Sequence, residues 1–254
     1  MNNRRSSRLL VQKAATSDGA EAATGPTKTR RSKRRFPIRR MVWRILFIVL
    51  ALPVLLALMY RFVPPVSTLM IGRWFSLAPV DRQWVPLESM SPELVRAVIA
   101  AEDARFCGHG GVDWVALNDV LDGAGDDGPA RGASTITMQT VKNVFLWPGR
   151  SYIRKGLEIP LSMMVDVVWG KPRTMEVYLN VAEWGEGIFG AEAAARHYFG
   201  KGARQLSRRE AALLAAALPN PLQRDARRPT RYMSVYAGRI GARMPGATIG
   251  CTGL

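Results

Sequence analysis

The sequence has few of the residues that build metal centres. It contains two cysteines, Cys107 and Cys251, and two histidines, His109 and His197, among 254 residues. These four residues lack the spacing of a zinc site, so the sequence argues against one. So few cysteines suit either the cytosol or a bacterial periplasm, and their number leaves open both the compartment and whether the two cysteines form a bond.

Acidic residues are scarce at the N-terminus, where most of the net charge of +16 is concentrated. Residues 1–44 hold 13 Lys and Arg against two acidic residues, while the other 210 residues hold 23 against 18. The rest of this segment is rich in Ser, Thr, Gly and Ala, a composition typical of disorder. We therefore predict a disordered basic tail over residues 1–40. This tail is expected to meet anionic lipid headgroups, with no nucleic acid as a partner.

Charge is absent from Ile45 to Tyr60, a run of 16 residues. With its apolar flanks, the segment 41–63 is long enough to span a membrane, and we predict a single-pass anchor there. A cleaved signal peptide is the alternative, but the run is longer than a usual signal core and no small-x-small site follows it at once. The positive charge before the anchor predicts a cytoplasmic N-terminus and a periplasmic domain at the bacterial inner membrane.

Alternating strand patterns are nearly absent after the anchor, which predicts a mostly α fold. Trp74, Phe75 and Trp84 suggest a membrane-proximal collar over residues 64–90, with ordinary core aromatics as the alternative. Residues 122–132 are rich in Gly and Asp and are predicted to form a mobile loop. Capping residues and apolar periodicity predict helices over 92–102 and 114–121, one that starts at Ser134 or Thr135 and runs to 146, one from 152 that Pro160 kinks, and others over 172–181, 191–199 and 208–218.

Glu102 is the first candidate catalytic residue. It lies four residues after Val98, on the apolar face of the predicted helix that starts at Ser91 and Pro92. Burial and the negative end of the helix dipole both raise the pKa of a carboxyl group there, which suits a general base. The alternative is an Asp/Glu pair at a fraying surface helix, and on this stretch alone the two readings are evenly balanced.

A basic cluster follows in the next two predicted helices. Residues 132–143 place hydroxyl side chains at a helix start, and Lys142 follows, then Arg150, Arg154 and Lys155. A pyrophosphate or carboxylate would fit these cations and a free helix N-terminus. A solvated basic face is the alternative. Glu158 lies within ion-pair reach of Arg154 and Lys155, either to neutralise them or as the second carboxylate of a site acting on a glycosidic carbon.

Gly185, Gly187 and Gly190 form a literal G-x-G-x-x-G, the pattern of dinucleotide-binding loops. Such a loop should follow a strand inside a βαβ unit, whereas this one follows a predicted helix. We interpret it as a coincidental loop, and no organic cofactor is expected.

In order, these stretches resemble the five motifs of the peptidoglycan glycosyltransferases of family 51. The first pattern, E-D-x-x-F-x-x-H-x-G-x-D, is met from Glu102 to Asp113. The second, G-x-S-T-I-T-Q-Q, is met from Gly132 to Gln139, except that Met138 stands where the family usually has glutamine. The third, R-K-x-x-E, is met by Arg154, Lys155 and Glu158, and the last two are KPRTMEVYLN and RREAALLAAALPNP. No S-x-x-K or K-T-G of a transpeptidase domain is present, so the resemblance is to the monofunctional type.

The resemblance implies a lysozyme-like helical lobe with a small membrane-proximal jaw lobe. The expected organisation is a glycosyltransferase domain over 91–225, with jaw elements within 112–150, and a C-terminal helix and tail over 226–254. The implied activity is polymerisation of lipid II into β-1,4 glycan with release of undecaprenyl pyrophosphate and inversion at the anomeric carbon. Expected partners are lipid II, the growing glycan strand and cell-division or elongation proteins.

By the same resemblance, Glu102 is the general base and Glu158 the second catalytic carboxylate. Related enzymes use a divalent ion such as Mg²⁺ or Mn²⁺ near the second glutamate, and the sequence shows no dedicated cage for it. The implied substrate-binding set is Asp103, Phe106, His109, Ser134, Thr135, Gln139, Lys142, Asn143, Arg150, Arg154 and Lys155.

Two rival functions remain open from the sequence. A lysozyme-like enzyme that cleaves glycan would share the fold and a helix-end glutamate, but would need neither the anchor nor the basic cluster. A non-catalytic membrane scaffold of the cell wall would need no glutamate chemistry at all.

Overall fold

A computed structural model describes residues 38–122, 134–149 and 151–254. The predicted tail over 1–40, apart from its last three residues, and most of the predicted loop over 122–132 lie outside these ranges. The described part is mostly helical, as predicted, with a small three-stranded sheet. The chain divides into two units, residues 1–43 and 44–254, with the boundary inside the first helix.

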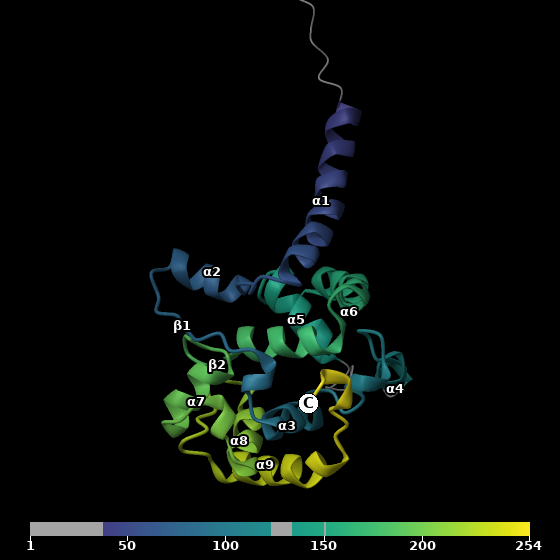
Figure 1. Cartoon of the computed structure of the whole chain (residues 1–254). Coiled ribbons are helices and arrows are strands. Elements are labelled where there is room, and N and C mark those ends of the chain that lie inside the picture. Colours follow the sequence, from purple (N-terminus) through teal and green to yellow (C-terminus); the bar gives the residue numbers. More distant parts are fainter. Residues whose placement is uncertain (1–37, 123–133, 150) are drawn as a thin grey trace, which may run out of the picture. The chain divides into compact units, whose positions relative to one another are not determined.

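The helices and strands follow one another along the chain as Figure 1 shows. The α-helices are α1 Ile38–Tyr60, α2 Thr68–Phe75, α3 Pro92–Glu102, α4 Trp114–Asp122, α5 Ile136–Phe145, α6 Tyr152–Val181, α7 Ala191–Phe199, α8 Arg208–Ala217 and α9 Arg231–Arg243. Short 3-10 turns lie at Leu87–Ser89, Phe106–Gly108, Ala203–Gln205, Met244–Gly246 and Gly250–Thr252. The strands are β1 Asp81–Arg82, β2 Glu183–Gly185 and β3 Ile188–Phe189, in the order β1-β3-β2.

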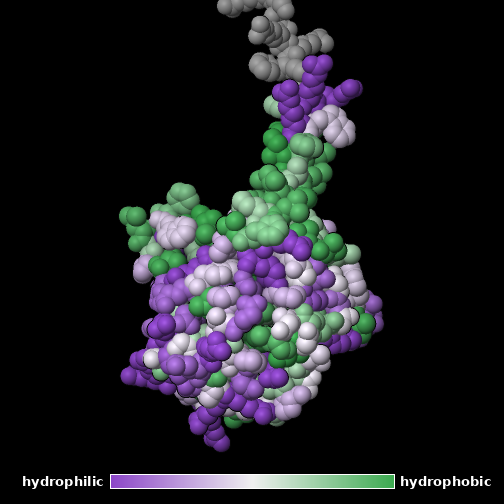
Figure 2. All heavy atoms as spheres, in the orientation of Figure 1, coloured by the Kyte–Doolittle hydropathy of each residue, from purple (hydrophilic) through white to green (hydrophobic). Residues whose placement is uncertain are grey.

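Helix α1 is long and apolar enough to cross a membrane. It begins three residues before the predicted anchor and ends three residues before its predicted end, since residues 61–63 form a turn. Apolar side chains gather on α1 and α2 in Figure 2, while the rest of that face carries mostly polar ones. On α2 and just after it, Trp74, Phe75 and Leu77 are exposed.

The capping signals of the sequence mark most of the observed helix ends. Ser91, Thr135, Ser151 and Ser207 each accept a hydrogen bond from a backbone N–H in the first turn of α3, α5, α6 and α8. Gly200 ends α7 in the left-handed conformation. Because a capping hydroxyl satisfies a backbone donor that the helix itself leaves unpaired, these helices begin where their caps stand.

Helix α6 differs from its predicted form. The helix runs on through Pro160, where we expected a kink, without leaving helical geometry. The expected new helix at Pro172 is confirmed, because the backbone leaves helical geometry at Gly170, with φ 68°, and a second helical stretch follows. Gly170 tolerates a positive φ, and Pro172 then starts a new helical stretch two residues later, at a position where proline is favoured.

Two hydrophobic clusters hold residues 44–254 together. The larger joins α3, α7, α8 and α9 and contains Leu94, Phe106 and Trp184. The smaller joins α5 and α6 to the end of α1, through residues such as Val141, Val165 and Ala57. The fourth motif contributes Arg173, whose guanidinium donates to the carbonyls of Tyr60 and Val63 and so fixes the chain where it leaves α1.

Candidate active site

The first motif ends α3 and forms the turn after it. Glu102 is the last residue of α3, and its Oε2 accepts a hydrogen bond of 2.8 Å from the amide nitrogen of Gln139 on α5. The Gln139 oxygen in turn accepts from the Tyr178 hydroxyl on α6 at 3.1 Å. This chain of two bonds fixes which end of the Gln139 amide faces the carboxylate, so the carboxylate receives an N–H group.

The electrostatic surroundings of Glu102 suit a proton acceptor. Burial raises the pKa of the Glu102 carboxyl group above its usual value, and the neighbouring Asp103 adds to the rise, while Gln139, Lys142 and Arg224 oppose it. Glu102 in turn helps raise the pKa of the buried Tyr178 hydroxyl, chiefly a burial effect. The direction of the Glu102 shift matches the prediction from its place on the inner face of the helix.

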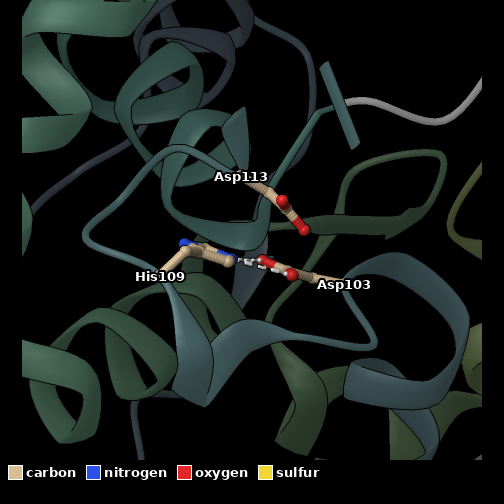
Figure 3. A group of neighbouring side chains, drawn as sticks. All are labelled: Asp103, His109 and Asp113. Carbon is tan, nitrogen blue, oxygen red and sulfur yellow. Dashed lines mark hydrogen bonds and ion pairs between the residues drawn. The ribbon is translucent and has the colours of Figure 1, made fainter. Parts of the chain in front are cut away.

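Asp103, His109 and Asp113 form a compact polar group (Figure 3), but their contacts are structural. The His109 Nε2 lies 2.9 and 3.0 Å from the two oxygens of Asp103, and one of these oxygens also accepts from the Ile136 N–H at the start of α5. Asp113 caps α4 through the N–H of Ala116 and pairs with Arg105 through both oxygens. Asp103 thus joins the end of α3 to the start of α5.

Their ligand atoms lie within 4.8 Å of one another, close enough to hold an ion. A cation there would have to displace Arg105 from Asp113 and His109 from Asp103, so the group is better suited to holding the turn than to holding a metal. Phe106 is buried beneath the turn, and the Lys171 ammonium lies 4.6 Å from the centre of its ring.

The surroundings of Gly111 explain why the first motif has a glycine at this position. Its φ is +85°, and a side chain at this position would place Cβ 2.4 Å from the backbone oxygen of Ser162 on α6. The Gly111 carbonyl also accepts a hydrogen bond of 2.6 Å from the hydroxyl of Thr135. A glycine is required because both the conformation and the close approach exclude a side chain.

The second motif supplies the N-terminus of α5. The Thr135 hydroxyl caps this helix by accepting from the N–H of Met138. Met138 itself is buried, so its apolar side chain packs in the protein where the family pattern has an amide. Asn143 lies one turn later, and its backbone carbonyl accepts from Thr68 of α2.

The basic cluster forms around Glu158. This buried carboxylate pairs with Arg154 and, at 2.9 Å, with Lys155, as the spacing on one helix turn predicted. The Lys155 ammonium also donates to the Ser134 hydroxyl at 2.6 Å, which joins α6 to the entrance of α5. Burial lowers the pKa of the Lys142 ammonium, and Glu158 and Glu102 both oppose that shift. Arg150, the remaining predicted cation, lies outside the described residues.

Two pockets meet at Glu102, which lines both of them. The first has a volume of about 240 Å³ and includes Arg105, Asp113 and Arg243. The second has a volume of about 420 Å³ and includes Gln139, Arg224 and two tyrosines of α9, Tyr232 and Tyr236. Ser134, the partner of Lys155, also lines both pockets. A carboxylate between two cavities, beside a cluster of cations, fits a reaction that joins two substrates.

The model of the transglycosylase family matches residues 70–244. The chain belongs to this family. Three relatives carry the name biosynthetic peptidoglycan transglycosylase. The one from Brucella suis is 58% identical over 79% of this chain and 90% of its own length. The one from Agrobacterium fabrum is 53% identical over 84% of this chain and 97% of its own length. The one from Rhizobium meliloti is 51% identical over 87% of this chain and 92% of its own length.

The family assignment confirms the resemblance drawn from the five motifs. The structure brings the motif residues of the transglycosylase together, with Glu102, Gln139 and Lys142 in one region and Ser134, Arg154, Lys155 and Glu158 next to it. Gly185, Gly187 and Gly190 lie in and after the β2–β3 hairpin, whose two strands run antiparallel, and Gly190 precedes α7.

Sequence reasoning did not assign a role to Tyr178, Arg224, Tyr232, Tyr236 or Arg243. Tyr178 lies inside the fourth motif, where its spacing of four from Thr174 marks only a helix face. Arg224 is one of several arginines after the last motif, and no local pattern sets it apart. Arg224 and the three residues of α9 reach the site through the packing of α8 and α9 against α3, which the sequence does not specify.

Proposed function

We propose that this protein is a peptidoglycan glycosyltransferase that polymerises lipid II at the outer face of the bacterial inner membrane. The observation that carries the proposal is the Glu102 carboxylate, which lies between two pockets and beside the cations of α5 and α6. Helix α1 supports membrane attachment close to a lipid-linked substrate. The proposed arrangement has a cytoplasmic N-terminus and a periplasmic catalytic domain.

In the proposed reaction, Glu102 takes the proton from the 4-hydroxyl of the acceptor sugar. The acceptor oxygen forms a bond to the anomeric carbon of the donor as the bond from that carbon to the pyrophosphate oxygen breaks. The pyrophosphate leaves with the bonding electrons, and the α configuration of the donor becomes a β-1,4 linkage. The raised pKa of Glu102 favours this step because it makes the carboxylate a stronger base.

Lys142, Arg154 and Lys155 are the proposed binding groups for the departing pyrophosphate, with Arg150 as a further member. Fixed cations in a partly buried site stabilise negative charge as it develops, and they need no reorganisation during the reaction. In this proposal Glu158 keeps Arg154 and Lys155 in place, since each contacts its carboxylate. Ser134 holds Lys155 from the other side.

The described residues do not fit a divalent cation held by Glu158. Both of its oxygens are occupied by cationic side chains, and Lys142 adds a third positive charge nearby. The proposed reaction therefore uses no metal ion in any step. Activity measured with Mg²⁺, with Mn²⁺ and with a chelator tests whether the enzyme needs one.

The test is polymerisation of labelled lipid II by the purified full-length chain in detergent. We expect polymer that a muramidase digests, and loss of at least 100-fold in rate for Glu102→Gln, the range of general-base catalysis. Glu93→Gln is the matched control, since Glu93 starts the same helix and pairs with Arg96 at the surface. Fragments released from purified glycan in place of polymer would favour a lytic enzyme. Full cellular function of Glu102→Gln would favour a scaffold.

A further inference from the structure

Three of the residues that line the 420 Å³ pocket, Arg224, Tyr232 and Tyr236, lie outside the five motifs. Arg224 lies between α8 and α9, and its guanidinium donates to the carbonyl of Ala216 at 2.7 Å. Its central carbon is 5.7 Å from the ring centre of Tyr232 and 5.8 Å from that of Tyr236. The two rings are 6.4 Å apart and nearly parallel, with 20° between their planes. These contacts place Arg224 and both rings next to one another in the lining of the pocket.

This surface is suited to a sugar ring. Flat aromatic faces pack against the C–H face of a pyranose, while the guanidinium and the Gln139 amide offer polar contacts to its hydroxyl and amide groups. The pocket volume lies in the range of about 300–1,000 Å³ for pockets that bind small molecules. Glu102 on the opposite wall disfavours a phosphate, which the cations around Glu158 would bind better.

The pocket also continues away from Glu102. Arg224 lines a further cavity of about 300 Å³, together with His197, Gln223 and Asp225. Arg224 therefore lines two neighbouring cavities, and Glu102 lines the one that Arg224 shares with Tyr232 and Tyr236.

We propose that Arg224, Tyr232 and Tyr236 form a subsite for a sugar ring of the growing glycan strand, and that the cavity beyond Arg224 holds the sugars that follow. The inference rests on the proposed polymerase function. It assigns the strand to the α9 side of Glu102 and gives the C-terminal helix a direct part in substrate binding.

Binding of lipid-free glycan tests the subsite without turnover. The probes are the tetrasaccharide and the disaccharide obtained by muramidase digestion of glycan, titrated into the full-length chain in detergent by calorimetry. We expect the tetrasaccharide to bind more tightly than the disaccharide. Tyr232→Ala, Tyr236→Ala and Arg224→Gln should each weaken tetrasaccharide binding about tenfold, a change of about 1.4 kcal/mol. Tyr232→Phe keeps the ring and should bind like the wild type.

Val235→Ala is the matched control, since Val235 lies on α9, is half exposed and does not line the pocket. Thermal unfolding of each variant identifies any that fails to fold, and Tyr232, which is 69% exposed, is not needed for packing. Equal tetrasaccharide affinity in wild type, Tyr232→Ala and Val235→Ala would overturn the inference.

Polymerisation of lipid II separates this inference from the function on which it rests. Tyr232→Ala should raise the KM and shorten the product strands with little change in kcat, because it weakens the hold on the strand and leaves Glu102 intact. Arg224→Gln should also shift the rising limb of the pH profile to higher pH. It removes a positive charge that lowers the pKa of Glu102, while Gln139, Lys142 and Asp103 remain around the carboxylate.

A wild type that makes no polymer would overturn the proposed function. Polymer of equal length from wild type, Tyr232→Ala and Val235→Ala would overturn the subsite alone. Both results are read from the same gel, so the two failures are distinguishable.

Discussion

At the scale of single residues, the site is held by side chains that each contact two elements. Gln139 links Glu102 on α3 to Tyr178 on α6, and Asp103 links α3 to the start of α5. Motif residues therefore serve two purposes, since some position the helices on which the reacting groups stand. The roles of Glu102, Lys142 and Lys155 in the reaction stay predictions for the assays described above.

Glu102→Gln is expected to stabilise the fold at neutral pH. Because the folded protein raises the pKa of this carboxyl group, the charged form is less stable in the folded state than in the unfolded chain. The penalty is present above the folded pKa and disappears as the pH falls below the unfolded value, where both states are protonated. Each unit of pKa shift corresponds to about 1.4 kcal/mol.

The measurement is the free energy of unfolding of Glu102→Gln and wild type at several pH values. The difference should be largest near neutral pH and vanish in acid. The polymerisation rate of the wild type should rise with pH through the same raised pKa, since the base must be ionised. Equal stability of the two proteins at neutral pH would contradict the account of Glu102 as a buried carboxyl group with a raised pKa.

Gly111→Ala is expected to lower stability by more than about 2 kcal/mol. The substitution meets both the cost of a positive φ and a clash between Cβ and the oxygen of Ser162. Gly110→Ala is the matched control, because its Cβ would lie 3.9 Å from the nearest atom, Asp166 Oδ2. Chemical denaturation of the two variants measures the difference, and equal midpoints would contradict the account.

At the scale of helices and strands, the sequence predicts an element where its signals lie within a few residues of one another. The helices capped by Ser91 and Ser207 were predicted to start there, and α5 was predicted to start at Ser134 or Thr135. In each case a capping hydroxyl and the apolar period lie within a few residues of each other. The sheet was not predicted. Its strands are two or three residues long, and β1 pairs with β3 through Asp81 and Ile188, which lie far apart in the chain.

The residues of the candidate site also divide into those with a local signal, which were predicted, and those without one. The residues of the first three motifs were predicted because each motif lies on one turn or one helix end. The tyrosines of α9 were not, because their place beside Glu102 depends on how α9 packs on α8 and α3. The break in α6 lies at Gly170 because a residue with a positive φ cannot continue a helix. Pro172 does not break the helix, since proline is tolerated in the first turn of a helical stretch.

Helix α2 is expected to enter the membrane interface. Trp74 and Phe75 at its end and Leu77 just after it are exposed, Figure 2 shows apolar side chains over α2, and exposed apolar clusters of this kind mark docking surfaces. In proteoliposomes, a nitroxide label at Phe75→Cys should be accessible to oxygen dissolved in lipid and protected from an aqueous nickel reagent. A label at Arg239→Cys on α9 is the control and should show the reverse. A water-exposed label at position 75 would contradict the prediction.

At the scale of the whole molecule, the disulfide between Cys107 and Cys251 joins the active-site turn to the end of the chain. The sequence left this pairing open, and the structure forms it across a separation of 144 residues. Cys107 lies between Asp103 and His109, so the bond fixes the turn that follows Glu102. Disulfides persist in oxidising compartments, which supports the proposed periplasmic location of the domain.

Removal of this bond is expected to lower the free energy of unfolding by about 2–5 kcal/mol, because a cross-link over a long loop restricts the unfolded chain. The test variant carries Cys107→Ser and Cys251→Ser together, which avoids an unpaired thiol. Reductant should destabilise the wild type to the level of this variant and leave the variant itself unchanged. In cells, alkylation of the denatured wild type should find both thiols blocked if the domain is periplasmic. Free thiols in the folded cellular protein would contradict both the bond and the topology, because a cytoplasmic domain would stay reduced.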